Sequence, residues 1–350
     1  MKSVVPVDAM RDASSTPKPT KPERVASGVP SFSVVIPTRN RPEGLRRALA
    51  SALVQHFGPL EVIVVDEAST PPAREALGDL LDDPRVVLLR HEAPVGAAAA
   101  RNAAHARVRG DWIAYLDDDD TFAPGKLARV AVEIERFGSS IDVVYHDLLI
   151  QLTTQRFAYR NAPDPGPITL DRLLVKNLLG GPSMVVVRAQ SVFDVGGFPD
   201  LPGAEDHGLY LELAAAGARF RYLTEVLGTY ERTSRGGLAR GEQARTMSLE
   251  RADAAYGRIA VRFAPELAAW PEARRRERRR HFLTFRAYRQ LVGGDGAGAA
   301  RDFIRAFRVA PGPRAALLLA AAAAARVSPS LTLTAQGWFK QRWRGVDRVA

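Results

Sequence analysis

The chain has 350 residues, a net charge of +10 and no cysteine, and this length predicts two or three domains with ample material for a core. Without cysteine it has neither a disulfide framework nor thiol chemistry, which fits a reducing compartment, and we expect a cytoplasmic protein. The basic residues are concentrated at one end: residues 241–350 contain 21 lysines and arginines against 9 acids, a balance of +12, so residues 1–240 carry −2. Because the basicity is local, the overall charge does not argue for a nucleic-acid partner, and we predict none.

The N-terminal segment, residues 1–30, is rich in proline, serine, lysine and aspartate and has no apolar stretch of the kind a secretory signal needs. Such a composition cannot bury enough apolar surface to fold. We therefore expect a disordered tail.

Residues 31–120 alternate short apolar runs with segments of helical periodicity. Strands are expected at 33–36, 60–65, 86–89 and in the first half of 110–120, and helices are expected after Asn40, over 72–81 and from Gly96. Asn40 is placed to cap the first helix, with Pro42 in its first turn and Glu43 at the capping-box position. This β-α-β-α-β-α-β order predicts half of a doubly wound domain with a parallel sheet.

The remainder of the chain continues the pattern and then becomes helical. A helix is expected from Pro124 to Phe137, and another over 209–216 with Glu205 and Asp206 at its head. Further strands are expected at 142–146, 184–187, 220–223 and 226–230. Residues 151–168 look irregular, and from residue 241 the sequence is Ala- and Arg-rich, with breaks near 293–298 and 311–313.

Four adjacent carboxylates, Asp117 to Asp120, follow the strand that begins near Trp112. A protein core does not tolerate four neighbouring negative charges without partners, so they must lie at the strand's end, in water or on a cation. Ligands of open parallel sheets bind beyond the carboxyl ends of the strands. The pattern indicates a divalent metal held by oxygen ligands and bridging to a phosphorylated substrate. The alternative is a solvated acidic loop that begins the next helix.

Five motifs in this order resemble those of family 2 glycosyltransferases of the GT-A fold, over about residues 31–235. They are Val-Val-Ile-Pro-Thr-Arg-Asn-Arg-Pro at 34–42, Glu-Val-Ile-Val-Val-Asp-Glu-Ala-Ser-Thr at 61–70, Gly-x4-Arg-Asn at 96–102, Leu-Asp-Asp-Asp-Asp at 116–120 and Gly-Gly-Phe-x6-Glu-Asp at 196–206. The resemblance implies an α/β, Rossmann-like, mostly parallel sheet flanked by helices, with a C-terminal α-helical extension.

The same resemblance implies a division of the chain and an activity. Residues 31–120 would be the half that binds the nucleotide sugar, residues 121–240 the acceptor-binding and catalytic half, and residues 241–350 a helical C-terminal region. The activity would be metal-dependent, inverting transfer of a hexosyl or deoxyhexosyl group. The donor would be a nucleotide-diphosphate sugar, and the acceptor a hydroxyl on a glycan, a lipid-linked molecule or a natural product.

Residue roles also follow from the resemblance. Pro37, Thr38 and Arg39 would hold the nucleotide, Asp66 would accept a hydrogen bond from the base, Arg101 would meet the diphosphate, Asp117 and Asp118 would contact the donor, Asp119 with Asp117 would hold Mg²⁺ or Mn²⁺, and Asp206 would be the catalytic base. The chemistry agrees with these roles, because a guanidinium forks onto phosphate oxygens and an acceptor hydroxyl needs a base. A helix N-terminus and a metal would both lower the pKa of Asp206, which predicts a weak base.

Simpler interpretations exist for two of these positions. Arg101 is alternatively an exposed helix arginine, and Glu205 with Asp206 alternatively complements a helix dipole. The chain also departs from the family pattern: Glu67-Ala68 stands in place of the usual Asp-Gly, and Ala104 stands where a glycine often follows. The first departure leaves the identity of the nucleotide open.

Three other classes fit less well. A sugar nucleotidyltransferase typically has a Gly-rich loop where this chain has 37–40, and a catalytically inactive sugar-nucleotide-binding module would tolerate loss of the acids, which are all present. A processive synthase needs membrane spans and a Gln-x-x-Arg-Trp motif soon after the Glu-Asp pair. The apolar run 315–325 is too short to cross a bilayer, and Gln-Arg-Trp at 341–343 has the wrong place and spacing.

The segment 271–280 contains six arginines, followed by Phe282, Leu283 and Phe285. On a helix the arginines at 275, 276 and 279 share one side. One interpretation is a solvated helix face. The other is peripheral contact with the anionic inner face of the cytoplasmic membrane, where a lipid-linked acceptor would be found.

Overall fold

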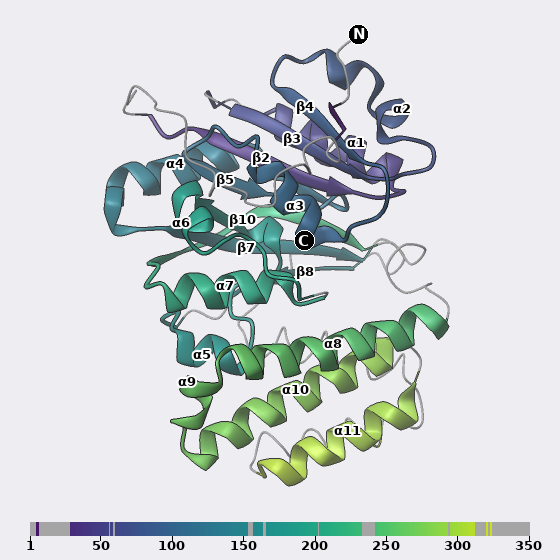
Figure 1. The fold of residues 1–350 in the computed structure, drawn as a ribbon, viewed down its shortest axis with the longest axis vertical. Coiled ribbons are helices and arrows are strands. Elements are labelled where there is room, and N and C mark those ends of the chain that lie inside the picture. The colour runs from purple at the N-terminus through teal and green to yellow at the C-terminus, as the bar shows by residue number, and fades with distance from the viewer. Residues whose placement is uncertain are drawn as a thin grey trace, which may run out of the picture.

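The computed structural model describes residues 5–6, 29–55, 57–58, 60–152, 157–163, 166–201, 203–232, 242–292 and 295–311, with the single residues 320 and 323. An α/β layer built on one mixed sheet lies above a layer of C-terminal helices (Figure 1). The predicted fold class, a GT-A-like sheet with a helical extension, matches this architecture.

The first half of the sheet is parallel, as the sequence predicts. Its strands are β2 (Phe32–Thr38), β3 (Leu60–Glu67), β4 (Val86–His91) and β5 (Trp112–Tyr115), which run side by side in the order β4-β3-β2-β5. The connections are α1 (Pro42–Leu53), α2 (Ala73–Leu77) with the 3₁₀ turn η2 (Gly78–Asp82), and α3 (Ala97–His105). The carboxyl ends of β2, β3 and β5 therefore meet at one edge, and the acids after β5 lie there.

The second half mixes strand directions. From β5 outward the order is β9 (Val185–Arg188), β7 (Val143–Leu152), β10 (Phe220–Arg232) and β6 (Asp120–Phe122). Strand β9 is antiparallel to both its neighbours, and β7 and β10 are parallel. The helical elements are α4 (Lys126–Phe137), η3 (Gly138–Ser140), α5 (Leu170–Val175), η4 (Pro182–Met184), α6 (Ala189–Asp194) and α7 (Glu205–Ala215).

Several local predictions were wrong. Arg41, not Asn40, is the N-cap of α1, and Asn40 instead has a left-handed backbone with φ of 54°. Its amide donates to Ser69 and its side chain accepts from Thr70, so it braces the loop after β3. Residues 151–168 are not wholly irregular, because β7 continues to Leu152 and β8 (Phe157–Asn161) pairs with it. The two strands predicted over 220–230 are one long strand, β10, with irregular register.

The expected disordered tail falls mainly outside the described residues. Val5 and Pro6, however, form a two-residue strand, β1, that pairs in parallel with β4, so that expectation does not hold for them. The Gln-Arg-Trp segment at 341–343 also lies outside the described residues, as does all of 315–325 except residues 320 and 323.

Both faces of the sheet are buried, which explains why its strands are apolar at successive positions. On β2, Val34 and Ile36 face a core shared with α1 and α4, while Val35 faces a core shared with α3 and α7. All three side chains are fully buried. The sheet is thus held rigidly between two helical layers, and the loops at its carboxyl edge inherit that rigidity.

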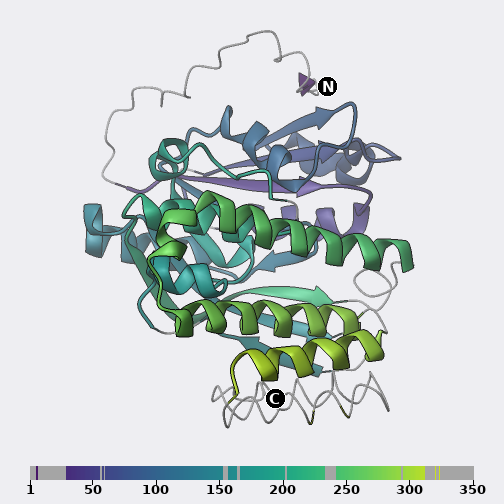
Figure 2. The ribbon, with the colours of Figure 1, turned by 60° about the horizontal axis from the view of Figure 1, so that its bottom comes forward.

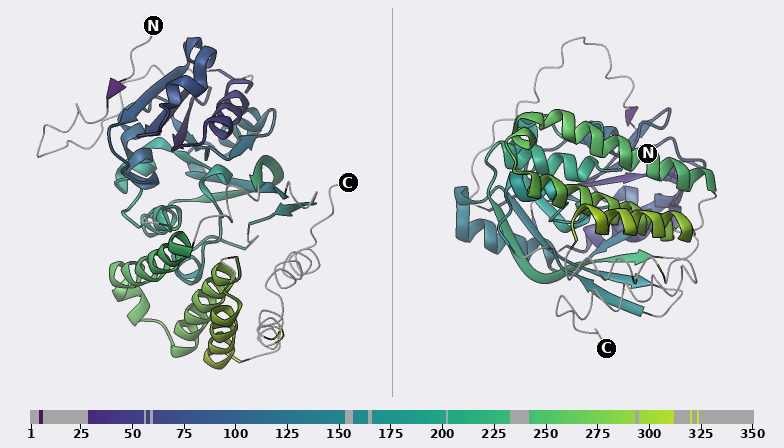
Figure 3. Two further views of the ribbon diagram at one scale, coloured as in Figure 1. Left: turned by 90° about the vertical axis from the view of Figure 1, so that its right-hand side faces the viewer. Right: turned by 90° about the horizontal axis from the view of Figure 1, so that it is seen from below.

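The C-terminal helices are α8 (Glu242–Arg262), α9 (Ala264–Ala268), α10 (Glu272–Val292) and α11 (Gly296–Val309). Ile259, Phe263 and Trp270 join the core cluster on the α7 side of the sheet, so this layer is packed on the α/β layer (Figures 2 and 3). Helix α10 contacts α5, α8 and α11. Among the residues described, no helix is both long enough and apolar enough to cross a bilayer.

Gly44, in the first turn of α1, sets how closely that helix approaches the acidic loop. A Cβ at this position would lie 2.3 Å from the backbone oxygen of Asp118. Since backbone cannot move aside as a flexible side chain does, any larger residue must push α1 away from the loop after β5.

We expect Gly44→Ala to destabilise the fold by about 1–3 kcal/mol, the usual cost of overpacking a well-packed region. The matched control is Gly257→Ala in α8, where a Cβ would meet nothing within 4 Å and which should stabilise by up to about 1 kcal/mol through helix propensity. Urea unfolding of both variants measures the difference. Equal effects of the same sign would contradict the close approach.

Candidate functional site

The acidic loop is fastened to the end of β2. The Thr38 hydroxyl donates to Asp118 at 2.8 Å, and Arg41 Nη1 donates to Asp118 at 2.9 Å and to Asp119 at 2.7 Å. Residues 80 positions apart in sequence are thereby joined at the carboxyl edge of the sheet. Arg39 is exposed, and Arg41 is the basic residue of the Pro-Thr-Arg-Asn-Arg motif that contacts the acidic loop. The expected contact of Arg39 with a nucleotide stays a prediction. Pro37 is buried within β2.

Asp66, at the end of β3, organises the loop that follows it. Its carboxylate is 1% exposed and accepts from the backbone amides of Ser69 at 2.9 Å and Ala73 at 3.0 Å, and it pairs with Arg90. These contacts hold the start of α2. The expected hydrogen bond from a nucleotide base stays a prediction, and in this arrangement the carboxylate serves the loop.

The Glu67-Ala68 departure has a structural counterpart. Ala68 has φ of 54°, in the left-handed region where glycine is favoured. Glu67 accepts a hydrogen bond from the Gly96 amide at 2.7 Å and so ties β3 to the start of α3.

Arg101 is a buried residue at the centre of the site. Its side chain is 4% exposed, Nη2 donates to Asp117 at 2.6 Å, and Nη1 pairs with Glu205 at 3.4 Å. The guanidinium also lies over the Phe198 ring, 5.1 Å from its centroid. Although burial opposes the charge, the two carboxylates raise the pKa of Arg101 above its ordinary value. The interpretation as an exposed helix arginine is wrong, and Glu205 does more than complement a helix dipole.

Asn102, the next residue on α3, fastens the Gly-Gly-Phe turn. Its amide group exchanges two hydrogen bonds of 2.8 Å with the backbone of Phe198. A Cβ on Gly197, whose φ is +81°, would lie 2.5 Å from the Asn102 oxygen, so the turn needs glycine here. The Arg-Asn pair therefore holds together the acidic loop, the turn after α6 and the start of α7.

The acids after β5 form a cluster rather than a solvated loop. Ligand oxygens of Asp117, Asp119 and Asp120 all lie within 4.8 Å of one another. Burial, with repulsion between neighbours, raises the pKa of Asp118 to about 6 and also raises the pKa values of Asp119 and Asp120. A nearby cation stabilises the ionised form of carboxyl groups whose pKa values are raised by burial and mutual repulsion. The donor set, all carboxylate oxygen, suits Mg²⁺ or Mn²⁺.

Lys126 lies behind this cluster. Its ammonium is fully buried, donates to the Ser183 carbonyl at 2.9 Å and lies 3.7 Å from the centroid of the Phe122 ring. The negative charge of Asp120 stabilises the charged form of Lys126. Burial outweighs this effect and lowers the pKa of the lysine. Ser183 also accepts the Asp117 amide at 2.9 Å, which fixes the backbone where the acids begin.

Asp206 lies in the first turn of α7, beside the Arg101 cluster, which consists of Arg101 and its partners Asp117 and Glu205. Its carboxylate accepts from the His207 amide at 2.7 Å and from the Asn177 side chain at 3.3 Å. Burial, and secondarily the charge of Glu205, raise its pKa from 3.8 to about 7. The prediction of a lowered pKa for Asp206 was therefore wrong for the protein without a bound metal. Desolvation raises this pKa by more than the dipole at the N-terminus of α7 lowers it. A carboxylate with this pKa is a good general base near neutral pH.

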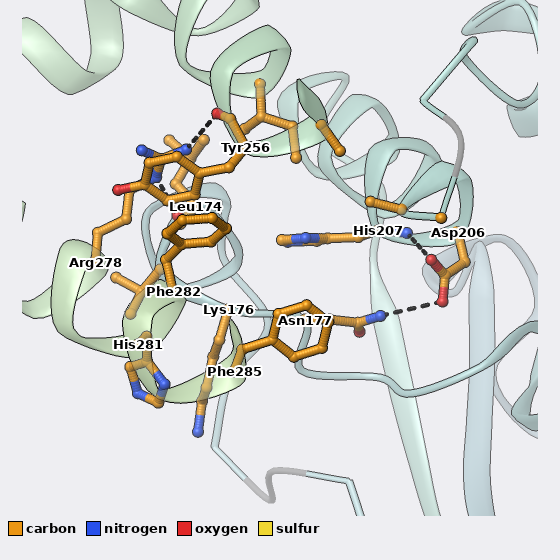
Figure 4. A pocket seen from close by; sticks show the side chains of 15 residues that line it. Leu174, Lys176, Asn177, Asp206, His207, Tyr256, Arg278, His281, Phe282 and Phe285 are labelled. Carbon is orange, nitrogen blue, oxygen red and sulfur yellow. Dashed lines mark hydrogen bonds between the residues drawn. The ribbon is translucent and has the colours of Figure 1, made fainter. Parts of the chain in front are cut away.

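Asp206 also borders a cavity of about 400 Å³ between α5, α7, α8 and α10 (Figure 4). Asn177 and His207 line it beside Asp206, and Tyr256, Phe282 and Phe285 line it from the C-terminal helices. Asp206 therefore has the Arg101 cluster on one side and an open cavity on the other.

Comparison with known proteins assigns part of the chain to a family. Residues 33–192 match the family described as glycosyl transferase family 2. The chain carries a family 2 glycosyltransferase domain.

Curated relatives support the same assignment. An uncharacterized glycosyltransferase of Haemophilus influenzae is 32% identical over 52% of this chain and 61% of its own length. The putative teichuronic acid biosynthesis glycosyltransferase TuaG of Bacillus subtilis is 27% identical over 57% of this chain and 79% of its own length. The succinoglycan biosynthesis protein ExoO of Rhizobium meliloti is 39% identical over a third of each chain. The chain thus spans less than two thirds of the Haemophilus and Rhizobium relatives.

Solved structures share the fold. Residues 1–349 of S. aureus TarS in complex with UDP-GlcNAc superpose with a TM-score of 0.53 at 20% identity, over 89% of this chain and 92% of that one. The mannosyltransferase PcManGT from Pyrobaculum calidifontis, in complex with GDP-Man and Mn²⁺, gives 0.50 at 19% identity, over 90% and 88%. Both alignments extend well beyond the glycosyltransferase domain into the C-terminal helices.

Sequence reasoning missed several residues that the structure places at this site. Arg41 is one, although it stands two positions after the chosen Arg39 in the same motif. Asp120 is another, since the fourth acid of the run was not proposed as a ligand, and Asn177 is a third. The Arg-Asn spacing did signal Asn102, but nothing in the sequence links Asn177 to Asp206.

Replacing Asp206 tests its environment through stability. With a pKa of about 7 in place of 3.8, the folded protein holds a proton between these pH values that the unfolded chain has released. The stability from this group is therefore present below pH 3.8 and lost as the pH rises through 7. Relative to Asp206→Asn, we expect the wild type's free energy of unfolding to fall by up to about 4 kcal/mol across this range. Denaturant titrations from about pH 4.5 to 8 measure it, and parallel curves would contradict the raised pKa.

Proposed function

We propose that the chain is a metal-dependent, inverting glycosyltransferase that moves a hexosyl or deoxyhexosyl group from a nucleotide-diphosphate donor to a hydroxyl acceptor. The observation that carries the proposal is the link between two groups of acids. Arg101 pairs with Asp117 of the metal-binding cluster and with Glu205, the neighbour of Asp206. A site for the leaving group and a general base are thereby held side by side.

The donor would lie along the carboxyl edge of β2, β3 and β5. Pro37, Thr38, Arg39 and Asp66 are proposed to contact the nucleotide, and Asp117 and Asp118 the donor's ribose and diphosphate region. Arg41 and Arg101 present guanidinium groups at the same edge, where they suit phosphate oxygens. Two proteins of the same fold are described with UDP-GlcNAc and with GDP-Man bound, which supports a nucleotide-sugar donor here.

Asp119 and Asp117 are proposed to hold Mg²⁺ or Mn²⁺, with Asp120 as a third ligand. The fit rests on the clustering of their oxygens and on the raised pKa values of Asp119 and Asp120. When bound, the cation supplies positive charge that stabilises the departing diphosphate. Arg101 is placed to add to that charge from its buried position.

Asp206 is proposed to take the proton from the acceptor hydroxyl as the hydroxyl oxygen bonds to the anomeric carbon. The bond from that carbon to the phosphate oxygen breaks, and the nucleoside diphosphate leaves with its electron pair. Attack opposite to the leaving group inverts the anomeric centre. The Asn177 amide donates to one Asp206 oxygen and the His207 amide to the other, which orients the carboxylate.

The three parts of the chain are proposed to have different roles. We propose residues 31–120 as the half that binds the nucleotide sugar, residues 121–240 as the acceptor-binding and catalytic half, and residues 241–350 as a helical C-terminal region whose helices α8 and α10 line the cavity beside Asp206. We place the enzyme in the cytoplasm.

A pair of variants separates donor binding from chemistry. Asp119→Ala should abolish the Mn²⁺-dependent rise in melting temperature with UDP- or GDP-sugars, since bound donor stabilises the fold by mass action, and EDTA should do the same to wild type. Asp206→Asn should keep that rise but lose turnover about 100-fold or more, the usual scale for a general base. Wild-type turnover should increase as the pH rises through about 7.

Either of two outcomes would overturn these roles. Full, metal-dependent activity in Asp119→Ala would remove it as a ligand. Loss of donor affinity in Asp206→Asn would make Asp206 a binding residue and place the base elsewhere.

The arginine run on α10 has two sides. Arg278 is buried and donates to the carbonyls of Leu174 and Tyr256. The arginines at 275, 276 and 279 are exposed, as their shared side predicts, although Glu272 pairs with the first two. The apolar positions nearby are partly used inside the protein: Leu283 is buried. Phe285 is partly exposed but lines the cavity beside Asp206. Contact of the three arginines with an anionic membrane would therefore be electrostatic.

We propose that this exposed side attaches the enzyme to an anionic membrane surface. Replacing Arg275, Arg276 and Arg279 with Gln should remove binding to phosphatidylserine-containing liposomes at low salt, since each arginine contributes about 1 kcal/mol near such a surface. Cosedimentation measures it, with neutral liposomes and high salt as controls. Absence of wild-type binding at low salt would leave the run as solvated surface.

A further inference from the structure

The cavity beside Asp206 is built by two parts of the chain that are distant in sequence. One side comes from α5, the segment after it and α7; the other comes from α8 and α10. Its volume of about 400 Å³ lies in the range of small-molecule sites, roughly 300–1,000 Å³. Asn177, Asp206 and His207 lie on the first side, and Tyr256, Phe282 and Phe285 lie on the second.

The wall contributed by the C-terminal helices is aromatic and braced. Tyr256 and Phe282 stack with ring centroids 4.0 Å apart, and the Arg278 guanidinium lies 3.7 Å from the centroid of the Tyr256 ring. Arg278 is itself fixed by a hydrogen bond of 2.9 Å to the Leu174 carbonyl. Phe285 is 48% exposed although it belongs to this wall, and in Figure 4 its ring lies on the side of the cavity toward Asn177. Its partly exposed ring adds an apolar face to this wall of the cavity.

The charges around the cavity are distributed unevenly. Asp206 stands at one end, and Lys176 and His281 lie away from it (Figure 4). The arginines at 274 and 280 also act on His281, whose pKa is lowered to about 4 by burial and by these cations together with Lys176. Glu277 acts on His281 in the opposite sense, and Arg274 is paired with Asp171 and Glu277. The positive charge at the end of the cavity remote from the base therefore comes mainly from Lys176 and Arg280.

We propose that this cavity is the acceptor site and that it takes an anionic sugar, with a ring face on Phe285 and Phe282 and a carboxylate or phosphate group near Lys176. This assignment rests on the proposed function, since it needs Asp206 as the base. Aromatic faces carry partial negative charge and attract the C–H groups of a sugar ring. The cavity shares no lining residue with the acidic cluster or the end of β2, so it is not the donor site.

Binding of matched probes to the full chain tests the proposal. The probes are phenyl β-glucoside and phenyl β-galactoside with the corresponding phenyl uronides, which differ only in carrying a carboxylate at C6 and contain no phosphate that would favour the donor site. Ligand-observed NMR in the presence of UDP and Mn²⁺, and separately GDP and Mn²⁺, measures affinity. We expect a uronide to bind about threefold or more tightly than its neutral partner, the scale of one partly exposed charge pair.

Two variants locate the binding. Phe285→Ala should weaken neutral and anionic probes alike, by about fivefold, because both lose the aromatic face. Lys176→Gln should remove the preference for the uronide and leave the neutral probe unchanged. The control is Val261→Ala, at an apolar side chain of the same helical layer that is 79% exposed outside the cavity, and it should change neither.

The outcomes separate this inference from the proposed function. Melting-temperature shifts with UDP or GDP and Mn²⁺ report the donor side alone. If a nucleotide binds but no probe does, or if probes bind with equal affinity to wild type and Phe285→Ala, the acceptor assignment is overturned and the proposed function stands. If the uronide binds wild type no more tightly than its neutral partner, the anionic assignment is overturned. If the uronide preference survives in Lys176→Gln, the placement of the anionic group near Lys176 is overturned. If no nucleotide binds, the proposed function fails, and with it the acceptor role of the cavity, whatever the probes do.

Discussion

The buried guanidinium of Arg101 is the constraint on which the site depends. It comes from α3, reaches Asp117 after β5 and Glu205 at the head of α7, and lies over Phe198 in the turn between α6 and α7. A buried charge of this kind is stable only while its partners stay in place. Because the partners come from three segments besides α3, the single cation fixes their relative positions, and the neighbouring Asn102 reinforces this through the Phe198 backbone.

Crowding of carboxylates is the complementary feature. Burial raises the pKa values of Asp118, Asp119 and Asp206, and in each case nearby acids add to the effect. The fold offsets part of this repulsion with Arg41 and Arg101. The repulsion that remains between the carboxylates favours binding of a divalent cation at this edge of the sheet. It also favours a carboxylate that accepts a proton near neutral pH.

Much of this architecture could be predicted from the sequence, because its strongest signals are local. The apolar runs at β2, β3 and β5, and the acids that end β3 and β5, predicted the parallel half of the sheet and its ligand-binding edge. The failures arose where tertiary context decides. Strand β8 exists only because β7 offers it a partner, and the raised pKa of Asp206 depends on desolvation by residues far away in sequence. Arg41 was missed because its partner Asp118 is 77 positions away, and a contact at that distance in sequence produces no local pattern of residues.

The direction in which each residue of α10 faces limits which sequence changes this helix can accept. Arg278, His281, Phe282 and Phe285 follow one another at spacings of three, one and three residues and point into the cavity, while the arginines at 275, 276 and 279 are exposed. The helical turn angle of about 100° per residue places Arg276 opposite the cavity-lining residues, whereas Arg275 stands seven positions before Phe282 and lies on its side of the helix. Substitutions of the exposed arginines change charge without touching the cavity, but a single-residue insertion between 276 and 281 would rotate the aromatic wall away from it. Natural variation in this helix should accordingly be rich in exchanges and poor in insertions.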